Sequence, residues 1–211
     1  MKIARQNFIV YLIWIFLVGE VIWSLWQAQW NGAFVAAVTL GLTLLPLLFE
    51  ERLGVKLPMT FGATVVVFLF ATLFLGEVGD FYERYWWWDV ILHSGAAVGF
   101  GLIGFVLVFM LFEGDRFAAP PLSLAILSFC IAVSIGAMWE IFEFSLDEIF
   151  GFNTQKSGLQ DTMWDLIVNT VGASIGGAAG YFYLRGWYFG GLAKLIGQFI
   201  EANKQYFRKH K

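Results

Sequence analysis

The chain has 211 residues, of which 59% are hydrophobic and only 14% are charged, and its net charge is −3. A soluble domain of this size carries about 25% charged residues, so the composition argues against a water-soluble protein and predicts an all-α integral membrane protein. The small negative charge argues against nucleic acid as a partner. The only cysteine, Cys130, can form no disulfide within the chain.

The apolar residues are gathered in long runs. A helix needs about 20 of them to cross the hydrocarbon core of a bilayer. Runs of about this length cover residues 8–26, 31–49, 60–79, 88–112, 121–146 and 163–185. The segments between them contain charged or turn-forming residues, which are expected in loops. We therefore predict a six-transmembrane-helix bundle formed by residues 1–186.

The last 25 residues differ from the rest of the chain. Residues 187–211 carry apolar side chains at helical spacing, and Lys residues lie towards both ends of this segment. The apolar residues are Leu192, Ile196, Phe199 and Ile200. This pattern predicts an amphipathic helix on the cytoplasmic membrane surface. A solvated basic tail is the alternative.

The basic residues predict the orientation. With six spans, one side of the membrane receives both termini and the loops near residues 50–58 and 113–119. This side carries 11 of the 13 Lys and Arg residues, and the other side carries only Arg84 and Lys156. Because loops rich in Lys and Arg stay in the cytoplasm, both termini are predicted to be cytoplasmic.

The fourth run begins with Trp86, Trp87 and Trp88, and then contains Asp89 and His93. Trp side chains are enriched at membrane interfaces, so this cluster is expected at the outer boundary. The i, i+4 spacing places Asp89 and His93 on one helix face. Because charged groups are costly in lipid, this pair indicates a functional site.

Acidic residues of the last two runs are expected at the same depth. Glu140 and Glu143 lie on one face of the fifth helix, and Asp161, Asp165 and Asn169 follow at steps of four in the sixth. Glu20 in the first helix and Glu77 at the end of the third are also expected towards the outside. We therefore predict an outer-leaflet pocket formed by Asp89, His93, Glu140, Glu143, Asp161 and Asp165, supported by Asn169, Glu20 and Glu77.

Each part of this cluster also has a local explanation. Asp161 or Thr162 can cap the sixth helix, with Asp165 completing a capping box. His93 alone is often a hydrogen-bonded interior residue. The series Gly172, Gly176 and Gly180 is typical of close helix packing.

Together, however, these acids would repel one another in a low dielectric unless they are protonated, paired or bound to a cation. Few basic residues are predicted nearby, which favours a divalent cation or shared protons. Carboxylates with one imidazole suit Zn²⁺, Mn²⁺, Fe²⁺ or Mg²⁺. The Glu-x-x-His repeat of ferritin-like di-iron bundles is absent from the sequence.

The order Asp89-x-x-x-His93, Trp139-Glu140-x-x-Glu143, Asp161-x-x-x-Asp165 and Asn169-x-x-Gly172 resembles the YjdF-like family of bacterial inner-membrane proteins. The resemblance covers about 100 residues and implies a multi-pass protein of the bacterial inner membrane. The Asp-x-x-x-His and Asp-x-x-x-Asn-x-x-Gly elements are also similar, more weakly, to VanZ-like membrane proteins. In those proteins the Asp is typically followed by Lys, whereas Val90 follows Asp89 here.

Three functions remain open at this point. The first is a metal-dependent hydrolase or transferase acting on a lipid-linked substrate at the outer leaflet. The second is a protein that binds or transports a divalent cation or protons. The third is a scaffold whose polar cluster only joins the helices. The sequence does not predict the substrate, the metal or the oligomeric state.

Overall fold

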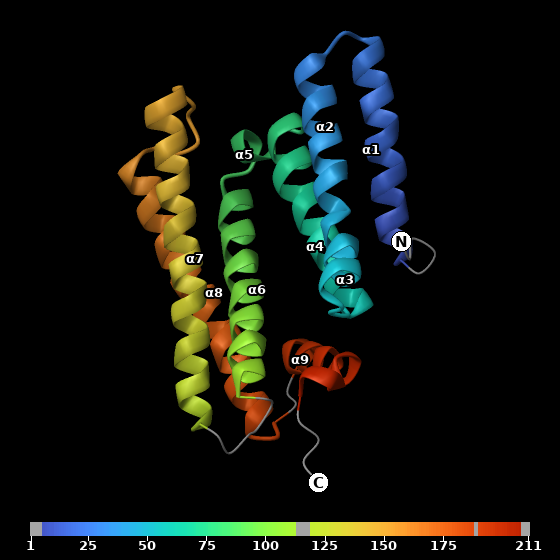
Figure 1. Cartoon of the computed structure of the whole chain (residues 1–211). Coiled ribbons are helices and arrows are strands. Elements are labelled where there is room, and N and C mark those ends of the chain that lie inside the picture. The colour runs from blue at the N-terminus through green and yellow to red at the C-terminus, as the bar shows by residue number, and fades with distance from the viewer. Residues whose placement is uncertain (1–5, 113–118, 188–189, 208–211) are drawn as a thin grey trace. The chain divides into compact units, whose positions relative to one another are not determined.

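The computed structural model describes residues 6–112, 119–187 and 190–207, and these residues are helical or irregular, with no β-strand among them. The predicted all-α class is therefore confirmed for the described part of the chain. The chain forms two compact units, Met1–Trp88 and Asp89–Lys211, which are described separately below (Figure 1). The predicted division at residues 186 and 187 stays a prediction.

Five helical stretches of the described residues are long and apolar enough to cross a membrane: Phe8–Trp26, Trp30–Arg52, Met59–Val78, Trp87–Leu111 and Pro121–Phe150. They correspond to the first five predicted runs. The sixth run falls in helix α8 (Leu159–Leu184), which is 26 residues long but is not among the five. Its many Gly residues and its Asp and Asn residues lower its hydropathy, so the sixth span stays a prediction.

The first unit begins with a helical hairpin. Helix α1 (Phe8–Trp26) and helix α2 (Trp30–Thr43) are joined by a turn in which Ala28 has a φ of 56°. Asn7 caps α1, because its side chain accepts a hydrogen bond from the backbone N–H of Ile9.

The second and third apolar runs each form two helical segments. The second run divides at Leu44, after which α3 (Leu45–Leu53) begins, with Pro46 in its first turn. The third run starts as α4 (Met59–Leu69) and continues as a π-helical segment, η2 (Phe70–Val78).

The core of the first unit is formed by apolar side chains from α1, α2, α4 and η2. Its buried members are Val10, Ile13, Leu17, Ala36, Ala63, Val66 and Phe74. A short helix, α5 (Phe81–Arg84), follows η2.

The second unit is built on three long helices that lie side by side: α6 (Trp87–Leu111), α7 (Pro121–Phe150) and α8. Because α7 runs opposite to α6 and α8, the beginnings of α6 and α8 lie at the same end as the end of α7 (Figure 1). We call this end of the second unit the acidic end. The opposite half is packed with apolar side chains: Leu102, Phe105, Val106, Val108, Phe109, Leu124, Tyr183 and Leu184.

Helix α9 (Gly190–Ala202) covers the half of the second unit that is remote from the acidic end. Ile196 is only 1% exposed, and Leu192, Phe199 and Ile200 pack against the same apolar core. These side chains therefore contact the protein itself, and the predicted contact of the tail with the membrane surface stays a prediction. Residues 188–189 and 208–211 of the predicted tail lie outside the described residues.

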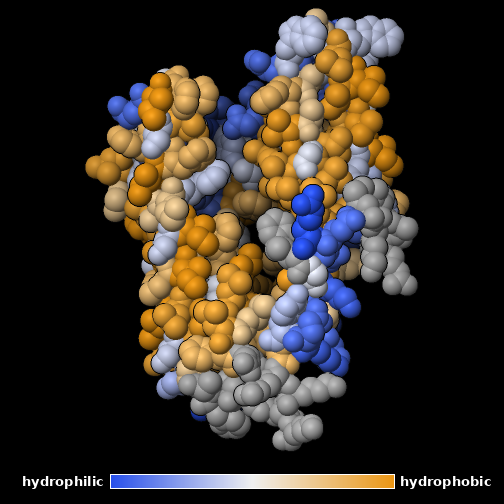
Figure 2. Space-filling view, in the orientation of Figure 1, coloured by the Kyte–Doolittle hydropathy of each residue, from blue (hydrophilic) through white to orange (hydrophobic). Residues whose placement is uncertain are grey.

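The outer surface of each unit is strongly apolar. Figure 2 shows hydrophobic residues over most of the visible face of both units. Many large side chains that point outwards are exposed by more than half, among them Phe8, Ile15, Leu122 and Ile141 at 60–72%. Such surfaces suit contact with lipid rather than water.

Candidate metal centre

The acidic end of the second unit brings together residues from all three long helices. The first turns of α6 contribute Asp89 and His93, and the C-terminal half of α7 contributes Glu140 and Glu143. The first turns of α8 contribute Asp165. Since α6 and α8 start at the end where α7 finishes, residues far apart in the sequence reach the same depth.

Ligand atoms of these residues form two overlapping groups. In the first group, one ligand atom each of Asp89, His93 and Asp165 lies within 4.8 Å of the others. In the second, the same holds for His93, Glu140 and Glu143. His93 belongs to both groups, so five of the six predicted ligands meet around one imidazole.

The two ring nitrogens of His93 face different carboxylates. Nε2 lies 3.5 Å from Oδ1 of Asp89, and Nδ1 lies 3.8 Å from Oε1 of Glu140. The side chain of His93 is 12% exposed, and those of Asp89 and Glu140 are 35% and 5% exposed. The cluster is therefore open on the side of Asp89 and closed on the side of Glu140.

Buried polar atoms without hydrogen bonds lie at the closed side. Neither carboxylate oxygen of Glu140 accepts a hydrogen bond of ordinary geometry, although the hydroxyl of Thr162 lies close enough to interact with this side chain. Nδ2 of Asn169 is also buried without a partner. A buried polar group that lacks a partner costs about 1–3 kcal/mol, and a charged group costs more. The burial of Glu140 therefore favours a compensating interaction at its carboxylate.

The structure gives Asp161 a different place from the other acids. It belongs to neither ligand group; Asp89 and His93 are among its electrostatic neighbours, and Lys156 lies close to its carboxylate. The predicted role of Asp161 as a ligand stays a prediction.

The capping explanation for the start of α8 is wrong. The N-cap is Gly158, with a φ of 61°, and no side chain caps the helix. Thr162 instead accepts a hydrogen bond from Nε2 of Gln155 at 2.6 Å. Asp165 is thus free of a capping role, and it is 97% buried beside the other acids.

Asp147 follows Glu143 by four residues, and so it lies on the same face of α7, but its contacts are structural. Its carboxylate accepts hydrogen bonds from the backbone N–H of Thr154 at 2.7 Å, the hydroxyl of Thr154 at 2.6 Å and the backbone N–H of Gln155 at 2.9 Å. These bonds fix the loop between α7 and α8, and so they position the beginning of α8. The separate roles of Asp147 and Glu143 could not be distinguished by their helical spacing.

Glycines allow the three helices to approach closely at this end. A Cβ built on Gly172 would lie 2.6 Å from the backbone oxygen of Ser94, and one built on Gly136 would lie 2.8 Å from Nδ2 of Asn169. The predicted packing role of the α8 glycines is confirmed at Gly172. Gly136 in addition leaves space for the side chain of Asn169.

The two predicted supporting acids, Glu20 and Glu77, both belong to the first unit. Glu20 accepts a hydrogen bond from the hydroxyl of Ser24 at 3.0 Å, and Glu77 is exposed at the end of η2. Their membership of the site stays a prediction.

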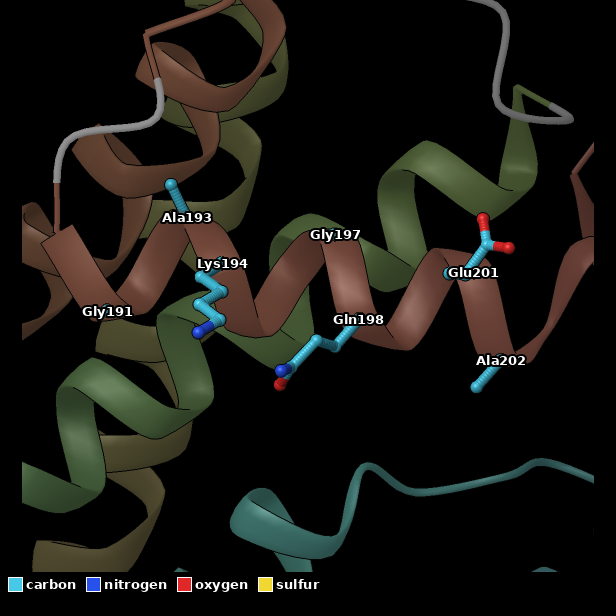
Figure 3. A pocket seen from close by; sticks show the side chains of 7 residues that line it. All are labelled: Gly191, Ala193, Lys194, Gly197, Gln198, Glu201 and Ala202. Carbon is cyan, nitrogen blue, oxygen red and sulfur yellow. The ribbon is translucent and has the colours of Figure 1, made fainter.

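A hollow elsewhere in the second unit is not part of this site. Figure 3 shows it along α9, which follows α8 and lies away from the acidic end. Its lining is made of small and polar side chains: Gly191, Ala193, Lys194, Gly197, Gln198, Glu201 and Ala202. Only one carboxylate lines it, so it lacks the donors of a metal centre.

The comparison with protein families concerns almost the whole chain. Residues 9–186 match a family described as "Predicted membrane protein (DUF2238)". The chain belongs to this family. The match extends from α1 to the end of α8 and includes every residue of the two ligand groups. The resemblance to the YjdF-like family is consistent with DUF2238, whereas similarity to VanZ-like proteins is not shown.

A relative of this DUF2238 protein comes from Thermotoga maritima and is described as "Uncharacterized protein". The two are 32% identical over 128 residues, which is 60% of this chain and 65% of the relative. The match thus spans just under two thirds of the relative's own length. No solved structure matches the chain.

The donors at the acidic end fit a divalent cation. Carboxylates and an imidazole are ligands of Mg²⁺, Mn²⁺, Fe²⁺ and Zn²⁺, whereas thiolate-selecting ions need Cys ligands. The single cysteine of this DUF2238 protein, Cys130, belongs to neither ligand group. The residues of these groups can therefore hold a hard or borderline metal ion.

Proposed function

We propose that this membrane protein binds a divalent cation at the acidic end of α6, α7 and α8, near the outer face of the bilayer. The observation that carries the proposal is the convergence of four carboxylates on the imidazole of His93, among them the buried Glu140, whose oxygens accept no hydrogen bond of ordinary geometry. A cation would compensate several carboxylates at once, which one imidazole cannot do.

The proposal includes six membrane spans, with α8 as the sixth. This helix is 26 residues long and lies beside α6 and α7, both of which are apolar enough to cross. At about 1.5 Å per residue, its length of roughly 39 Å exceeds the hydrocarbon core of about 30 Å. Its polar side chains Asp165 and Asn169 are buried inside the unit.

With six spans, the distribution of Lys and Arg places both termini in the cytoplasm. Six of the 11 cations on that side lie outside the described residues: Lys2, Arg5, Arg116, Arg208, Lys209 and Lys211. Together with the resemblance to YjdF-like proteins, this orientation supports a location in the bacterial inner membrane, with the acidic end towards the outside.

The chemistry that we favour is hydrolysis or group transfer on a lipid-linked substrate. A bound cation supplies a Lewis acid that can polarise a phosphate or ester oxygen. The site lies within the first turns of α6 and α8, so it is at the depth of lipid head groups, and Asp89 leaves it open on one side. Here Asp89, His93, Glu140, Glu143 and Asp165 would form the cation site, with the ligands of the ion drawn from one of the two ligand groups, and Asp161 and Asn169 would lie at its border.

Transport across the membrane is the alternative function. A transported ion needs polar groups along its whole path. The half of the second unit remote from the acidic end is packed with apolar side chains such as Phe105, Phe109 and Leu124. Among the described residues of that half, no ionisable side chain is buried except Tyr183. This arrangement favours a pocket that opens on one side.

Metal analysis of the purified protein tests the proposal. The wild type should retain close to one equivalent or more of Mn²⁺, Fe²⁺, Zn²⁺ or Mg²⁺ after extensive dialysis, and His93→Ala should lose it. The matched control is His210→Ala, which removes the only other histidine of the chain and should leave the metal content unchanged. A metal-free wild type that also binds none of these ions on titration would refute the cation site.

Purified protein incubated with a bacterial lipid extract tests the favoured chemistry. Mass spectrometry should show a lipid-linked species that is consumed with the cation present and persists with a chelator or with His93→Ala. If the wild type binds the cation but no species changes, the binding function stands and the enzymatic one is rejected.

A further inference from the structure

The imidazole of His93 stands between the two ligand groups. Its Nε2 is directed towards Asp89 and its Nδ1 towards Glu140. A neutral imidazole has one nitrogen with a lone pair and one N–H. The ring can therefore bind a cation on one side only, while it donates a hydrogen bond on the other.

The two sides of the ring differ in access. The carboxylate side chain of Asp89 is 35% exposed, whereas that of Glu140 is 5% exposed. A metal centre that exchanges its ion and keeps a coordination position for water or substrate needs an open side. This requirement is met on the side of Nε2.

The surroundings of Glu140 also favour a cation on the Nε2 side of the ring. Its two oxygens are buried without a hydrogen-bond partner, and Nδ1 of His93 is 3.8 Å from Oε1. A small movement of either side chain would bring the pair to about 2.9 Å, the usual N–H···O distance. An N–H on Nδ1 would then give Glu140 a partner and fix the orientation of the ring.

We infer that His93 binds the cation through Nε2, together with Asp89 and Asp165, and that Glu140 is a positioning residue that accepts a hydrogen bond from Nδ1–H. The inference rests on the proposed function, because it assigns roles within the same site. Metal-binding histidines commonly donate their second N–H to a carboxylate, which fixes the tautomer and makes the ligand more basic. Glu143 then lies next to Glu140 on the Nδ1 side of the ring.

The competing arrangement is an ion on the Nδ1 side, held by Glu140 and Glu143. The two arrangements predict opposite orders of effect for two conservative variants. If Glu140 positions the ring, Glu140→Gln should lower the affinity for Mn²⁺ by about 10–100-fold, since this is the usual effect of losing such a partner. Asp165→Asn should lower it further, because a ligand is removed.

Isothermal titration with Mn²⁺ on the full-length protein in detergent measures these affinities. Glu148→Gln, which changes an exposed acid on the same helix, is the matched control and should leave the affinity unchanged. Size-exclusion chromatography and thermal unfolding establish that each variant is folded. Glu140→Asp, which keeps a carboxylate acceptor, should recover part of the affinity that Glu140→Gln loses.

A spectroscopic measurement reports the hydrogen bond itself. With Cu²⁺ as the probe, the ring nitrogen remote from the ion modulates the electron spin echo, and its quadrupole coupling depends on the hydrogen bond that it makes. We expect Glu140→Gln to keep bound Cu²⁺ with one imidazole ligand and to shift this coupling. Asp165→Asn should leave the coupling in any residual signal unchanged.

Complete loss of Mn²⁺ in Glu140→Gln together with retention in Asp165→Asn would overturn the inference and place the ion on the Nδ1 side. Equal and complete loss in both variants would also overturn it, since both residues would then be ligands. In either case the wild type still binds the cation, so the proposed function survives. A wild type that binds neither Mn²⁺ nor Cu²⁺ refutes the proposed function instead.

Discussion

Gly101 on α6 and Gly176 on α8 meet backbone to backbone: a Cβ built on Gly176 would lie 2.8 Å from Cα of Gly101. No real side-chain carbon tolerates such a distance from a backbone atom without a shift of the helices. This contact holds the two helices at the separation at which Asp89 and His93 reach Asp165. The geometry of the candidate metal centre therefore depends on glycines that lie two to three turns away from it.

The first prediction concerns this contact. Gly176→Ala should lower the free energy of unfolding by about 1–3 kcal/mol, because the added methyl group overpacks the interface. It should also weaken cation binding, since α6 is displaced from α8. Thermal unfolding in detergent and Mn²⁺ titration measure the two effects.

Gly99→Ala is the matched control for this variant. It makes the same chemical change on α6, but a Cβ there meets no atom within 4 Å. Because Ala is the better helix former, the control should be neutral or slightly stabilising. Equal stability of the two variants would contradict the role assigned to the close contact.

Much of the fold could be predicted because the thickness of a bilayer sets the length of the apolar runs that form its helices. Five predicted runs correspond to helical stretches that are long and apolar enough to cross. The division of the second run at Leu44 and the π-helical segment from Phe70 to Val78 could not be predicted. The two changes of geometry begin at Leu44 and Phe70, inside apolar runs, so hydropathy contains no signal of them.

The candidate site could be predicted to a similar degree. The i, i+4 spacing of Asp89 and His93 and the shared depth of the acids on α7 and α8 indicated a common pocket, and the ligand groups contain five of the six predicted residues. The spacing could not separate Asp147 from Glu143, because both lie on one face of α7. Only the fold of the loop back to Thr154 shows that Asp147 anchors the chain.

The second prediction concerns this anchor. Asp147→Ala removes the acceptor for two backbone N–H groups and one hydroxyl, so the loop between α7 and α8 should open more often. Hydrogen exchange at the amides of Thr154 and Gln155 should become faster by at least tenfold, which corresponds to about 1.4 kcal/mol of local stability. Glu148→Ala, at the exposed neighbouring position, should leave the exchange unchanged. Unaltered exchange in Asp147→Ala would show that the loop is held by other contacts.

The third prediction concerns whether α8 crosses the membrane. In a Cys130→Ser background, Ser157→Cys before α8 and Gln198→Cys on α9 are both at exposed positions. If α8 is the sixth span, a membrane-impermeant thiol reagent applied to intact cells should label only Ser157→Cys, and Gln198→Cys should react only after permeabilisation. Labelling of both sites from the same side would show that α8 does not cross. Labelling of Ser157→Cys only after permeabilisation would reverse the predicted orientation.

The last prediction separates a metal centre from a structural polar cluster. If a cation is bound, a chelator should lower the melting temperature of the wild type, because the remaining carboxylates repel one another in a low dielectric. A cation present at about 100 times its dissociation constant stabilises the folded protein by roughly 2.7 kcal/mol, and this contribution is lost on chelation. Glu143→Gln removes one negative charge from beside His93, which weakens the electrostatic attraction for the cation, so it should bind the cation less tightly and respond less to the chelator, while Glu148→Gln should behave like the wild type.

A structural cluster requires the opposite result. Without a cation, Glu143→Gln relieves charge repulsion and keeps the shape of the side chain, so the variant should melt at the same temperature as the wild type or higher. A wild type that is insensitive to the chelator, combined with a more stable Glu143→Gln, would therefore reject the metal centre and leave the scaffold function. If the chelator lowers the melting temperature of the wild type more than that of Glu143→Gln, the result supports a bound cation. Only a bound ion makes the effect of the chelator depend on this carboxylate.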